Sequence, residues 1–264
     1  MFDEAARKAI IRVAREWWFD PAALLAVAEV ESGGQAGSFV DNRFEPLIRW
    51  EGHYFDRRLN EIDRAIARGA GLAHPRAGAV RNPPGQPARW RLLERAEALD
   101  RNAAWESTSW GLGQVMGAHW KLLGFADVAA LVAEAREGVS GQARLLAGFI
   151  AAAGLRPALE REEWAGFARG YNGPGFQRNA YDAKLARSFE RHARLAPLYP
   201  GARGARVRRL QTALAARDGG PVPDGIFGPL TETALRRFQA ERGLAADGIA
   251  GPQTLGALRL TLAG

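Results

Sequence analysis

Two glutamates near the end of one apolar segment are the first residues in this sequence that could do acid–base chemistry. Residues 20–34 read DPAALLAVAEVESGG. A spacing of three and four residues puts Glu31 on one helical face with Leu24 and Val27, so we expect it to extend an apolar stripe toward a core. Burial disfavours a charged carboxyl group and raises its pKa, which suits a general acid near neutral pH. Glu29 points elsewhere, so we expect the two glutamates to have different roles.

A helix must position this pair. Asp20 can accept a hydrogen bond from a free N–H of the first turn, and Pro21 fits the first helical position. The Gly33-Gly34 pair is a typical helix end. The alternative is that both glutamates are simply solvated near a helix C-terminus, where carboxylates oppose the helix dipole.

The composition limits the classes of protein to consider. The chain has 264 residues, of which 47% are hydrophobic and 25% charged, which is typical of a globular protein of one large or two ordinary domains; we expect two. It has no Cys and only four His without metal-ligand spacing, so we expect no disulfide, no metal and no cofactor.

The charge points to a polyanionic partner. The net charge is +7, and nearly all basic residues are Arg, because Lys occurs only at positions 8, 121 and 184. Nucleic acid, an anionic membrane and a phosphate-bearing bacterial envelope would all attract such a surface. No nucleic-acid module is recognisable, so we expect no nucleic-acid partner. Residues 1–18 lack the pattern of a secretory signal, and no segment has membrane-spanning length, so we expect cytoplasmic synthesis without a signal peptide and no stable membrane insertion.

Three further segments carry polar residues among aromatic ones or glycines. In residues 43–55, most of the charged residues have the pattern of core packing with exposed ends, and Glu51 is the exception of interest. Residues 69–90 are rich in Gly, Pro and Arg, a loop that either borders a cleft or is mobile. Residues 107–117 (STSWGLGQVMG) are expected to turn into a helix. The alternatives there are sugar stacking on Trp110 and a tight helix contact through glycine.

The C-terminal part contains an internal repeat. The sequence DGIFGPLT at 224–231 recurs as DGIAGPQT at 247–254, and each copy predicts a tight turn that leads into a helix. We expect helices over about 205–217, 229–242 and 252–262. Their small core should consist of Val207, Leu210, Leu214, Ala234, Leu235, Phe238, Leu255 and Leu258. Residues 196–202 are predicted to be a short Pro/Gly linker.

The motifs Glu31-Ser32, 111–115 (GLGQV) and 171–173 (YNG), in this order, resemble those of the lysozyme-like superfamily of peptidoglycan-cleaving enzymes. With 50–55 (WEGHYF), they are similar to the N-acetylmuramidase domain of phage endolysins, over about residues 1–195. The resemblance implies that Glu31 is the general acid and Glu51 the second carboxylate. Asp41 is the next candidate for the second carboxylate. It also implies a set of substrate-binding residues: Ser32, Trp110, Gln114, Tyr171 and Asn172. The sequence departs from the pattern at Gly52, where a charged residue is commoner.

The C-terminal repeat, together with Leu210-Gln211 and residues 237–239 (RFQ), resembles the three-helix peptidoglycan-binding domain of wall hydrolases. The implied residues of the wall-binding domain are Asp224, Phe227, Gly228 and Asp247. Individually, the repeated Asp, Gly and Pro are explained by turn formation, so we expect binding in the groove between the repeats.

Together these patterns predict a mainly all-α protein with a lysozyme-like catalytic domain (1–195), a linker (196–202) and a peptidoglycan-binding domain (203–264). The expected function is that of an endolysin, a glycoside hydrolase that cleaves the β-1,4 bond between N-acetylmuramic acid and N-acetylglucosamine and lyses the host. The alternatives are a lytic transglycosylase and a non-catalytic wall-binding phage protein. We expect a monomer that a holin releases and that acts on the wall in the periplasm.

Overall fold

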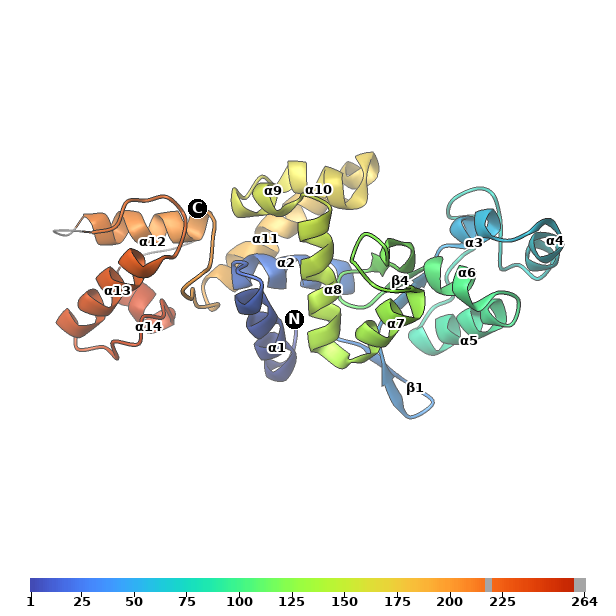
Figure 1. The fold of residues 1–264 in the computed structure, drawn as a ribbon, viewed down its shortest axis with the longest axis horizontal. Coiled ribbons are helices and arrows are strands. Elements are labelled where there is room, and N and C mark those ends of the chain that lie inside the picture. The colour runs from blue at the N-terminus through green and yellow to red at the C-terminus, as the bar shows by residue number, and fades with distance from the viewer. Residues whose placement is uncertain (217–219, 259–264) are drawn as a thin grey trace. The chain divides into compact units, whose positions relative to one another are not determined.

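The computed structural model describes residues 1–216 and 220–258, and this part of the chain is mainly helical, as predicted (Figure 1). It forms two compact units, one from Met1–Ala6 and Glu31–Ala152, and one from Arg7–Val30 and Ala153 onward. The N-terminal helices are α1 (Glu4–Glu16) and α2 (Pro21–Ser32). The remaining elements of the first unit are β1 (Ser38–Val40), β2 (Arg43–Glu45), β3 (Ile48–Trp50), α3 (Gly52–Arg58), α4 (Glu61–Gly69), α5 (Gln86–Glu97), α6 (Arg101–Glu106), β4 (Thr108–Trp110), β5 (Val115–Met116), η1 (Gly117–His119), α7 (Val128–Arg136) and α8 (Gly138–Ala152).

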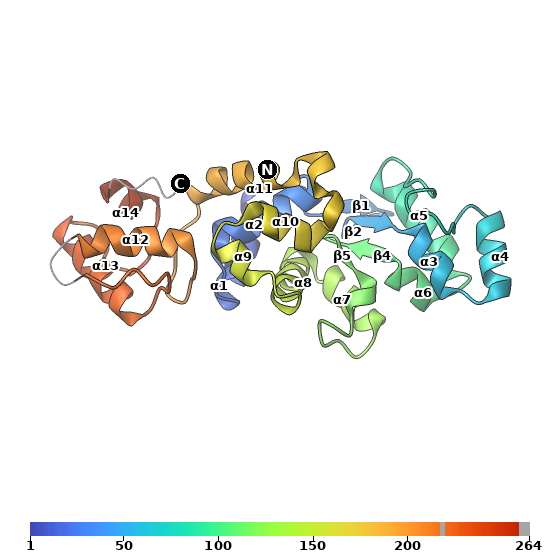
Figure 2. The same cartoon turned by 90° about the horizontal axis from the view of Figure 1, so that it is seen from above.

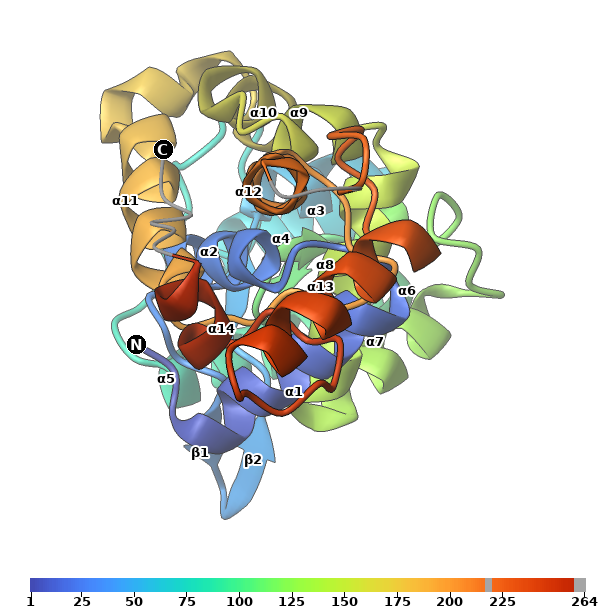
Figure 3. The same ribbon diagram turned by 90° about the vertical axis from the view of Figure 1, so that its left-hand side faces the viewer.

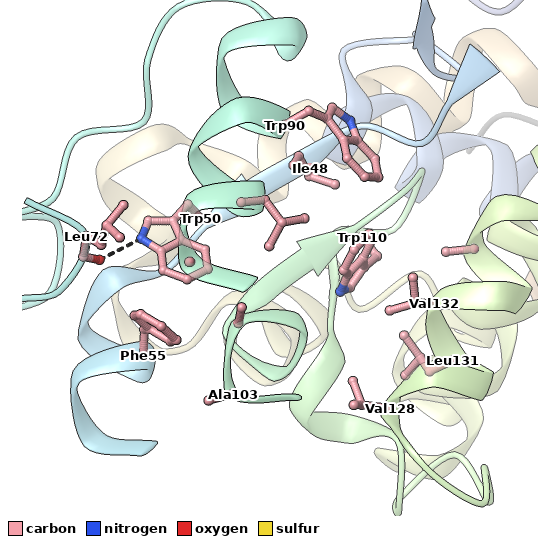
Figure 4. Close-up of a cluster of buried hydrophobic side chains, with 14 of the residues drawn as sticks. Ile48, Trp50, Phe55, Leu72, Trp90, Ala103, Trp110, Val128, Leu131 and Val132 are labelled. Atoms are coloured by element: carbon pink, nitrogen blue, oxygen red, sulfur yellow. Dashed lines mark hydrogen bonds between the residues drawn. The ribbon is translucent and has the colours of Figure 1, made fainter. Parts of the chain in front are cut away.

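A three-stranded antiparallel sheet in the order β3-β4-β5 lies at the centre of the first unit (Figure 2). Trp50 and Trp110 point from this sheet into the core, and Trp90 of α5 packs edge-on against Trp110 at 5.9 Å between ring centroids (Figure 4). The indole Nε1 of Trp50 donates to the backbone oxygen of Leu72 at 2.9 Å. The indole Nε1 of Trp90 donates to that of Pro46 at 3.3 Å. The buried aromatic rings therefore also satisfy their polar atoms.

The prediction for residues 107–117 is wrong in its secondary structure. Instead of a turn into a helix, the segment forms β4, a tight turn, β5 and the start of the short 3₁₀-helix η1. Gly111 has φ +67° and Gln114 has φ +48°, so the chain reverses sharply between the two strands. Pairing of this hairpin with β3, which lies some 60 residues earlier, decides its conformation.

The glycine- and proline-rich segment before α5 is held against the free edge of β3. The side chain of Asn82 accepts from the backbone N–H of Trp50 at 2.7 Å and donates to its carbonyl oxygen at 2.8 Å. Gln86 does the same for Ile48, at 2.9 and 3.3 Å. Two side-chain amides thus replace a neighbouring strand and satisfy the edge.

Strands β1 and β2 form a hairpin closed by Asp41 and Asn42. Both residues have positive φ, +46° and +63°, as a two-residue type I′ turn requires. Asp41 is therefore an exposed turn residue, and the turn accounts for its residue type.

The second unit contains most of α1 and α2 and the elements α9 (Arg156–Glu160), α10 (Trp164–Asn172), η2 (Pro174–Asn179), α11 (Tyr181–Ala193), α12 (Ala205–Ala215), α13 (Pro229–Glu241) and α14 (Pro252–Ala257). Asp20 caps α2 as expected: its Oδ1 accepts from the N–H of Ala22 at 2.8 Å.

Helices α12, α13 and α14 surround the small core that the repeat predicts (Figure 3). Six of the eight predicted core residues belong to this buried cluster, and the other two, Ala234 and Leu258, are partly buried and pack against it. The predicted end of the third helix beyond residue 258 lies outside the described residues. The segment 196–202, predicted to be a linker, contributes to this core, because Leu198 and Ala202 are buried in the same cluster. Leu198 pairs with Ala250, and Ala202 accepts from the N–H of Phe227.

Candidate active site

Helix α2 presents Glu31 at its C-terminal end. Residues 22–28 are at most 3% exposed, so the helix is buried on every side and has no single apolar stripe, contrary to the expectation from spacing. Glu31 itself is half-buried, because the helix ends one residue later. Gly33 and Gly34 follow with φ +65° and +79°, and a side chain on Gly34 would come within 2.8 Å of the backbone nitrogen of Met1. The end of the helix is thus fixed beside the chain start.

Ser32 is a structural neighbour of Glu31. It is 8% exposed, and its Oγ accepts from the N–H of Gly34 at 3.2 Å. The hydroxyl therefore helps to form the turn that ends α2.

Glu29 has a different environment, as the spacing predicts. Its Oε2 accepts from the hydroxyl of Ser188 at 2.5 Å, from the guanidinium of Arg191 at 3.0 Å and from Nε2 of His192 at 2.9 Å, all on α11. Burial alone would raise the pKa of Glu29, but the Ser188 hydroxyl and the neighbouring His192 and Arg191 outweigh it and hold the pKa below its ordinary value. Glu29 is thus an ionised anchor between α2 and α11.

Glu51 lies directly after β3 at the start of α3. Its carboxylate is 18% exposed, is paired with Nε of Arg49 at 3.0 Å and lies 3.5 Å from Nδ1 of His53. Burial lowers the pKa of His53 despite the nearby carboxylate, so the imidazole is neutral at pH 7. The backbone N–H of Glu51 donates to the oxygen of Ser107 at 2.9 Å, which fixes its position beside β4.

Gln114 sits at the opposite end of the same sheet. Its Nε2 donates to the backbone oxygen of Gly111 at 2.9 Å, and it approaches that of Leu47 at 3.5 Å. Leu47 precedes β3 and Glu51 follows it, and four residues of extended chain span about 13 Å. The structure therefore places Gln114 and Glu51 on one sheet but does not bring them together.

Gln142 supports the Gln114 turn, and the sequence reasoning missed it. It is 1% exposed, its Oε1 accepts from the N–H of Leu112 at 3.1 Å, and its side chain fills the space beside Gly111. Gly111 is required because a Cβ there would lie 2.7 Å from Gln142 Cγ. The available signal was a single amide side chain in a mostly apolar helix, GVSGQARLLAGFIAA.

The structure contradicts the proposed sugar stacking on Trp110. The indole is 1% exposed, packs against Trp90 and donates from Nε1 to the backbone oxygen of Trp105 at 3.1 Å. Both faces are occupied by core side chains, so Trp110 supports the sheet and offers no platform to a substrate.

Tyr171 and Asn172 end α10 in the second unit. The ring of Tyr171 is half-buried and stacks on Phe167 at 5.3 Å between centroids. Asn172 is exposed as the last residue of the helix, and Gly173 follows with φ +75°. Glu31, Ser32, Glu51 and Gln114 belong to the first unit.

In the C-terminal repeat, the two aspartates serve the turns. Asp224 Oδ1 accepts from Gln211 Nε2 at 2.8 Å and from the N–H of Ile226 at 2.8 Å. Asp247 repeats this pattern with Gln239 and Ile249, both at 2.9 Å. The backbone N–H of residue 226 or 249 and the Gln amide lower the pKa of each aspartate.

Phe227 is 1% exposed and belongs to the core, so its side chain is not a wall contact; this corrects the expectation for that residue. Gly228 immediately precedes α13.

Within residues 1–216 and 220–258, no three His, Asp or Glu side chains group so that they could hold a metal ion. Among the helices described, none combines the length and apolarity needed to cross a bilayer.

Two family models match the chain. The model described as N-acetylmuramidase matches residues 20–193, and the model described as putative peptidoglycan binding domain matches residues 203–258. The chain is similar to the crystal structure of the endolysin of Burkholderia phage AP3, with a TM-score of 0.61, 35% identity and 71% of each chain covered.

Two relatives match over shorter stretches. The zinc D-Ala-D-Ala carboxypeptidase of Streptomyces albus G is 50% identical over 60 residues, 22% of this chain and 24% of that protein. The N-acetylmuramoyl-L-alanine amidase CwlL of Bacillus licheniformis is 43% identical over 70 residues, 24% of this chain and 19% of that protein. The chain thus spans about a quarter or less of the length of these two relatives.

Proposed function

Because the chain belongs to the N-acetylmuramidase family, we propose that it is a lytic endolysin of the lysozyme type, which hydrolyses the β-1,4 bond between N-acetylmuramic acid and N-acetylglucosamine in peptidoglycan. The observation that carries the proposal is the family match across residues 20–193, which includes Glu31 near the end of helix α2, whose residues 22–28 are buried. The second match, to a peptidoglycan-binding domain, supports the same substrate.

In the proposed reaction Glu31 protonates the glycosidic oxygen as the bond breaks through an oxocarbenium-like state. Its place suits this role, because a rigid, buried helix holds the carboxyl group while its half-exposure leaves it open to a ligand. Gln114, Tyr171 and Asn172 are proposed to orient the substrate. The C-terminal module would concentrate the enzyme on the wall through a second contact.

The first test is mass spectrometry of the fragments released from purified peptidoglycan. Wild type should release muropeptides with a reducing muramic acid end. Glu31→Gln should lower the rate about 100-fold or more, since a positioned general acid contributes at least that factor. Glu94→Gln, which removes an exposed carboxylate on α5, is the matched control and should act like wild type. Full activity of Glu31→Gln would exclude this residue, and 1,6-anhydro products would identify a transglycosylase.

Glu51 is proposed as the second carboxylate, which would activate water or stabilise the cation. Its ion pair with Arg49 offers a purely structural alternative. Arg49→Gln separates the two roles, because it removes the partner and keeps the carboxylate. A large loss of rate in Glu51→Gln alone supports the catalytic role, whereas equal behaviour of the two variants assigns Glu51 to structure.

The route to the wall follows from this activity. We propose that the protein is made in the host cytoplasm, is released by a holin and acts as a monomer in the periplasm. Expression with and without a holin tests the route. Cells should lyse when the holin is co-expressed and should not lyse when this protein is expressed alone.

A further inference from the structure

Trp18 has an unusual backbone and an unusual exposure. It follows α1 with φ +57°, and the N–H of Phe19 donates to the oxygen of Ala14 at 2.8 Å, which is the hydrogen bond of a Schellman helix end. Glycine is preferred at the left-handed position of this motif, and a bulky side chain there is a true outlier. The side chain is nevertheless 56% exposed, so burial of the indole does not compensate for the backbone conformation.

The Trp18 ring lies against Gly201, at the base of the C-terminal domain. A Cβ on Gly201 would come within 2.8 Å of Trp18 Cδ1, so only glycine leaves the ring its place. The N–H of Gly201 donates to the oxygen of Phe227 at 2.8 Å, which ties this point to the first repeat. Both Trp18 and Gly201 belong to the second unit, so the ring has a defined position beside that repeat.

An open groove of about 340 Å³ runs between this ring and the first repeat. Its size falls within the range of small-ligand sites. Apolar and backbone surface comes from Pro200, Gly201, Ile226, Phe227, Gly228 and Pro229, with Ile226 41% exposed.

The groove offers one cation to an anionic group of a ligand. Arg203 and Glu232 are its two charged residues. Glu232 is paired with Arg236 at 2.8 Å. The guanidinium of Arg203 acts electrostatically on the Asp224 carboxylate, whose pKa it helps to lower, and no ion pair of Arg203 is among those found in the described residues. The N-terminus of α13 at Pro229 adds positive potential to the same groove. One aromatic ring, Trp18, and one cation, Arg203, therefore line the same small groove.

We propose that this groove is a binding subsite for the disaccharide-peptide unit of peptidoglycan, in which a sugar ring stacks on Trp18 and a stem-peptide carboxylate pairs with Arg203. Indole faces bind the apolar faces of sugar rings, and guanidinium groups bind carboxylates in a bidentate manner. The subsite is composite, because its ring comes from the segment between α1 and α2 and its cation from the segment before α12. The identity of the ligand rests on the proposed action on peptidoglycan.

The test is calorimetric titration of the full chain with a soluble N-acetylglucosaminyl-N-acetylmuramyl tetrapeptide. This probe has no bond of the proposed cleavable type, so binding is measured apart from hydrolysis. Trp18→Asn and Arg203→Gln should each raise Kd about tenfold. Phe39→Ala and Arg91→Gln remove an exposed aromatic ring and an exposed arginine elsewhere and should bind like wild type. Wild-type affinity in both groove variants would overturn the proposal.

Thermal unfolding controls for the fold. Asn tolerates a left-handed backbone, so Trp18→Asn should keep or raise Tm while binding weakens. If Tm falls instead, Trp18→Phe separates a loss of stacking from a loss of fold, because it restores an aromatic ring. Recovered muropeptide binding in this variant supports the subsite, and binding as weak as in Trp18→Asn overturns it.

Two further titrations separate the contributions of the two side chains. Binding of the disaccharide without peptide should still weaken in Trp18→Asn but should not change in Arg203→Gln. The reverse result would overturn the assignment of the two contacts. A DNA duplex that responds to Arg203→Gln while the muropeptide does not would likewise overturn it. The two proposals can fail separately. Full hydrolysis by Glu31→Gln would refute the proposed acid, and weakened muropeptide binding by the groove variants would still support the subsite.

Discussion

Gln211 and Gln239 each hold one turn of the C-terminal repeat with a single buried amide. Gln211 Nε2 contacts Asp224 Oδ1, the oxygen of Ile226 and the hydroxyl of Thr231, while its Oε1 accepts from the N–H of Gly225. Gln239 repeats these contacts within the second copy. Every hydrogen-bonding atom of the two amides is used, and such satisfied networks specify one local conformation.

At this scale we predict that Gln211→Leu lowers the free energy of unfolding by about 2–4 kcal/mol. The substitution leaves the Gly225 N–H and the Ile226 oxygen without their buried partner. Urea denaturation of the full chain, followed by circular dichroism, measures the change. Gln35→Leu replaces an exposed glutamine and should change stability little. A loss in Gln211→Leu as small as in this control would show that the amide is dispensable.

Helix α2 depends on α11 through Glu29. The carboxylate accepts three hydrogen bonds from Ser188, Arg191 and His192, only two residues before Glu31 on the same helix. We predict that Glu29→Gln lowers stability by about 1–3 kcal/mol, because charge-assisted bonds are lost. It should also reduce the rate of wall hydrolysis, since the orientation of Glu31 follows that of the helix. Glu16→Gln, near the end of α1, is a matched exposed control for both readouts. Unchanged stability would contradict the anchoring role.

The same contact should make stability depend on pH. Burial lowers the pKa of His192 from its ordinary value of 6.5 even though Glu29 opposes this, so at pH 7 a neutral imidazole donates from Nε2 to the carboxylate. A lowered histidine pKa means that the unfolded chain binds the proton more readily, so stability falls as pH drops below 6.5. The lowered pKa of Glu29 has the same sign below 4.5, where the unfolded carboxyl group is protonated first.

Thermal melts between pH 7.5 and about 5 measure this slope. His192→Gln keeps a donor to Glu29 and removes the titrating group, so the slope should decrease in this variant. His53 and His119, whose pKa values burial also lowers, contribute to what is left. An equal slope in wild type and His192→Gln would assign the dependence to those residues.

The free edge of β3 depends on Asn82. Because its side chain occupies both the N–H and the oxygen of Trp50, Asn82→Ala should cost about 1–3 kcal/mol and loosen the segment before α5. Amide hydrogen exchange of residues 48–51 and 70–85 should increase in the variant. Asn102→Ala, an exposed site on α6, is the control. Unchanged exchange at Trp50 would show that another group protects the edge.

At the scale of the whole molecule, a buried ion pair ties the C-terminal module to the helices before it within the second unit. Arg206 of α12 is 0% exposed, and it donates to Asp20 at 2.7 Å and to the oxygens of Ala193 and Ala196 at 2.9 and 2.7 Å. Asp20 also caps α2, so one carboxylate serves the start of α2 and the docking of α12. The side chains of Arg209 and Glu162 form a second ion pair, at 2.5 Å.

We predict that Arg206→Met costs about 3–5 kcal/mol, because it leaves the Asp20 carboxylate buried without its cation. Asp20→Asn keeps a cap acceptor and removes the charge. If the pair is coupled, the double variant should lose clearly less stability than the two single variants added together. Urea denaturation of wild type, the two single variants and the double variant measures the coupling energy between the two side chains. Additive losses would show that the two side chains act independently.

Local sequence determined much of this protein. Asp20, Pro21 and the Gly33-Gly34 pair mark the two ends of α2, because caps and left-handed glycines act over a few residues. The repeated DGIxGPxT motif marks two turns and the helices that follow them, because its Asp caps the turn through the N–H two residues on. The apolar spacing within the three helices marks the small core, because helical spacing acts over a few residues.

Tertiary structure decided what depends on distant partners. Residues 107–117 became a hairpin because β3 pairs with β4, and Trp110 became a core residue because Trp90 packs against it. Leu198 and Ala202, in the segment predicted to be a linker, are buried in the C-terminal core because their backbones pair with Ala250 and Phe227. The roles of Gln142, Arg206 and Trp18 arise from residues 30 or more positions away, whose proximity no local pattern encodes. A sequence records which side chains are available, whereas burial and pairing depend on which of them the folded chain brings together.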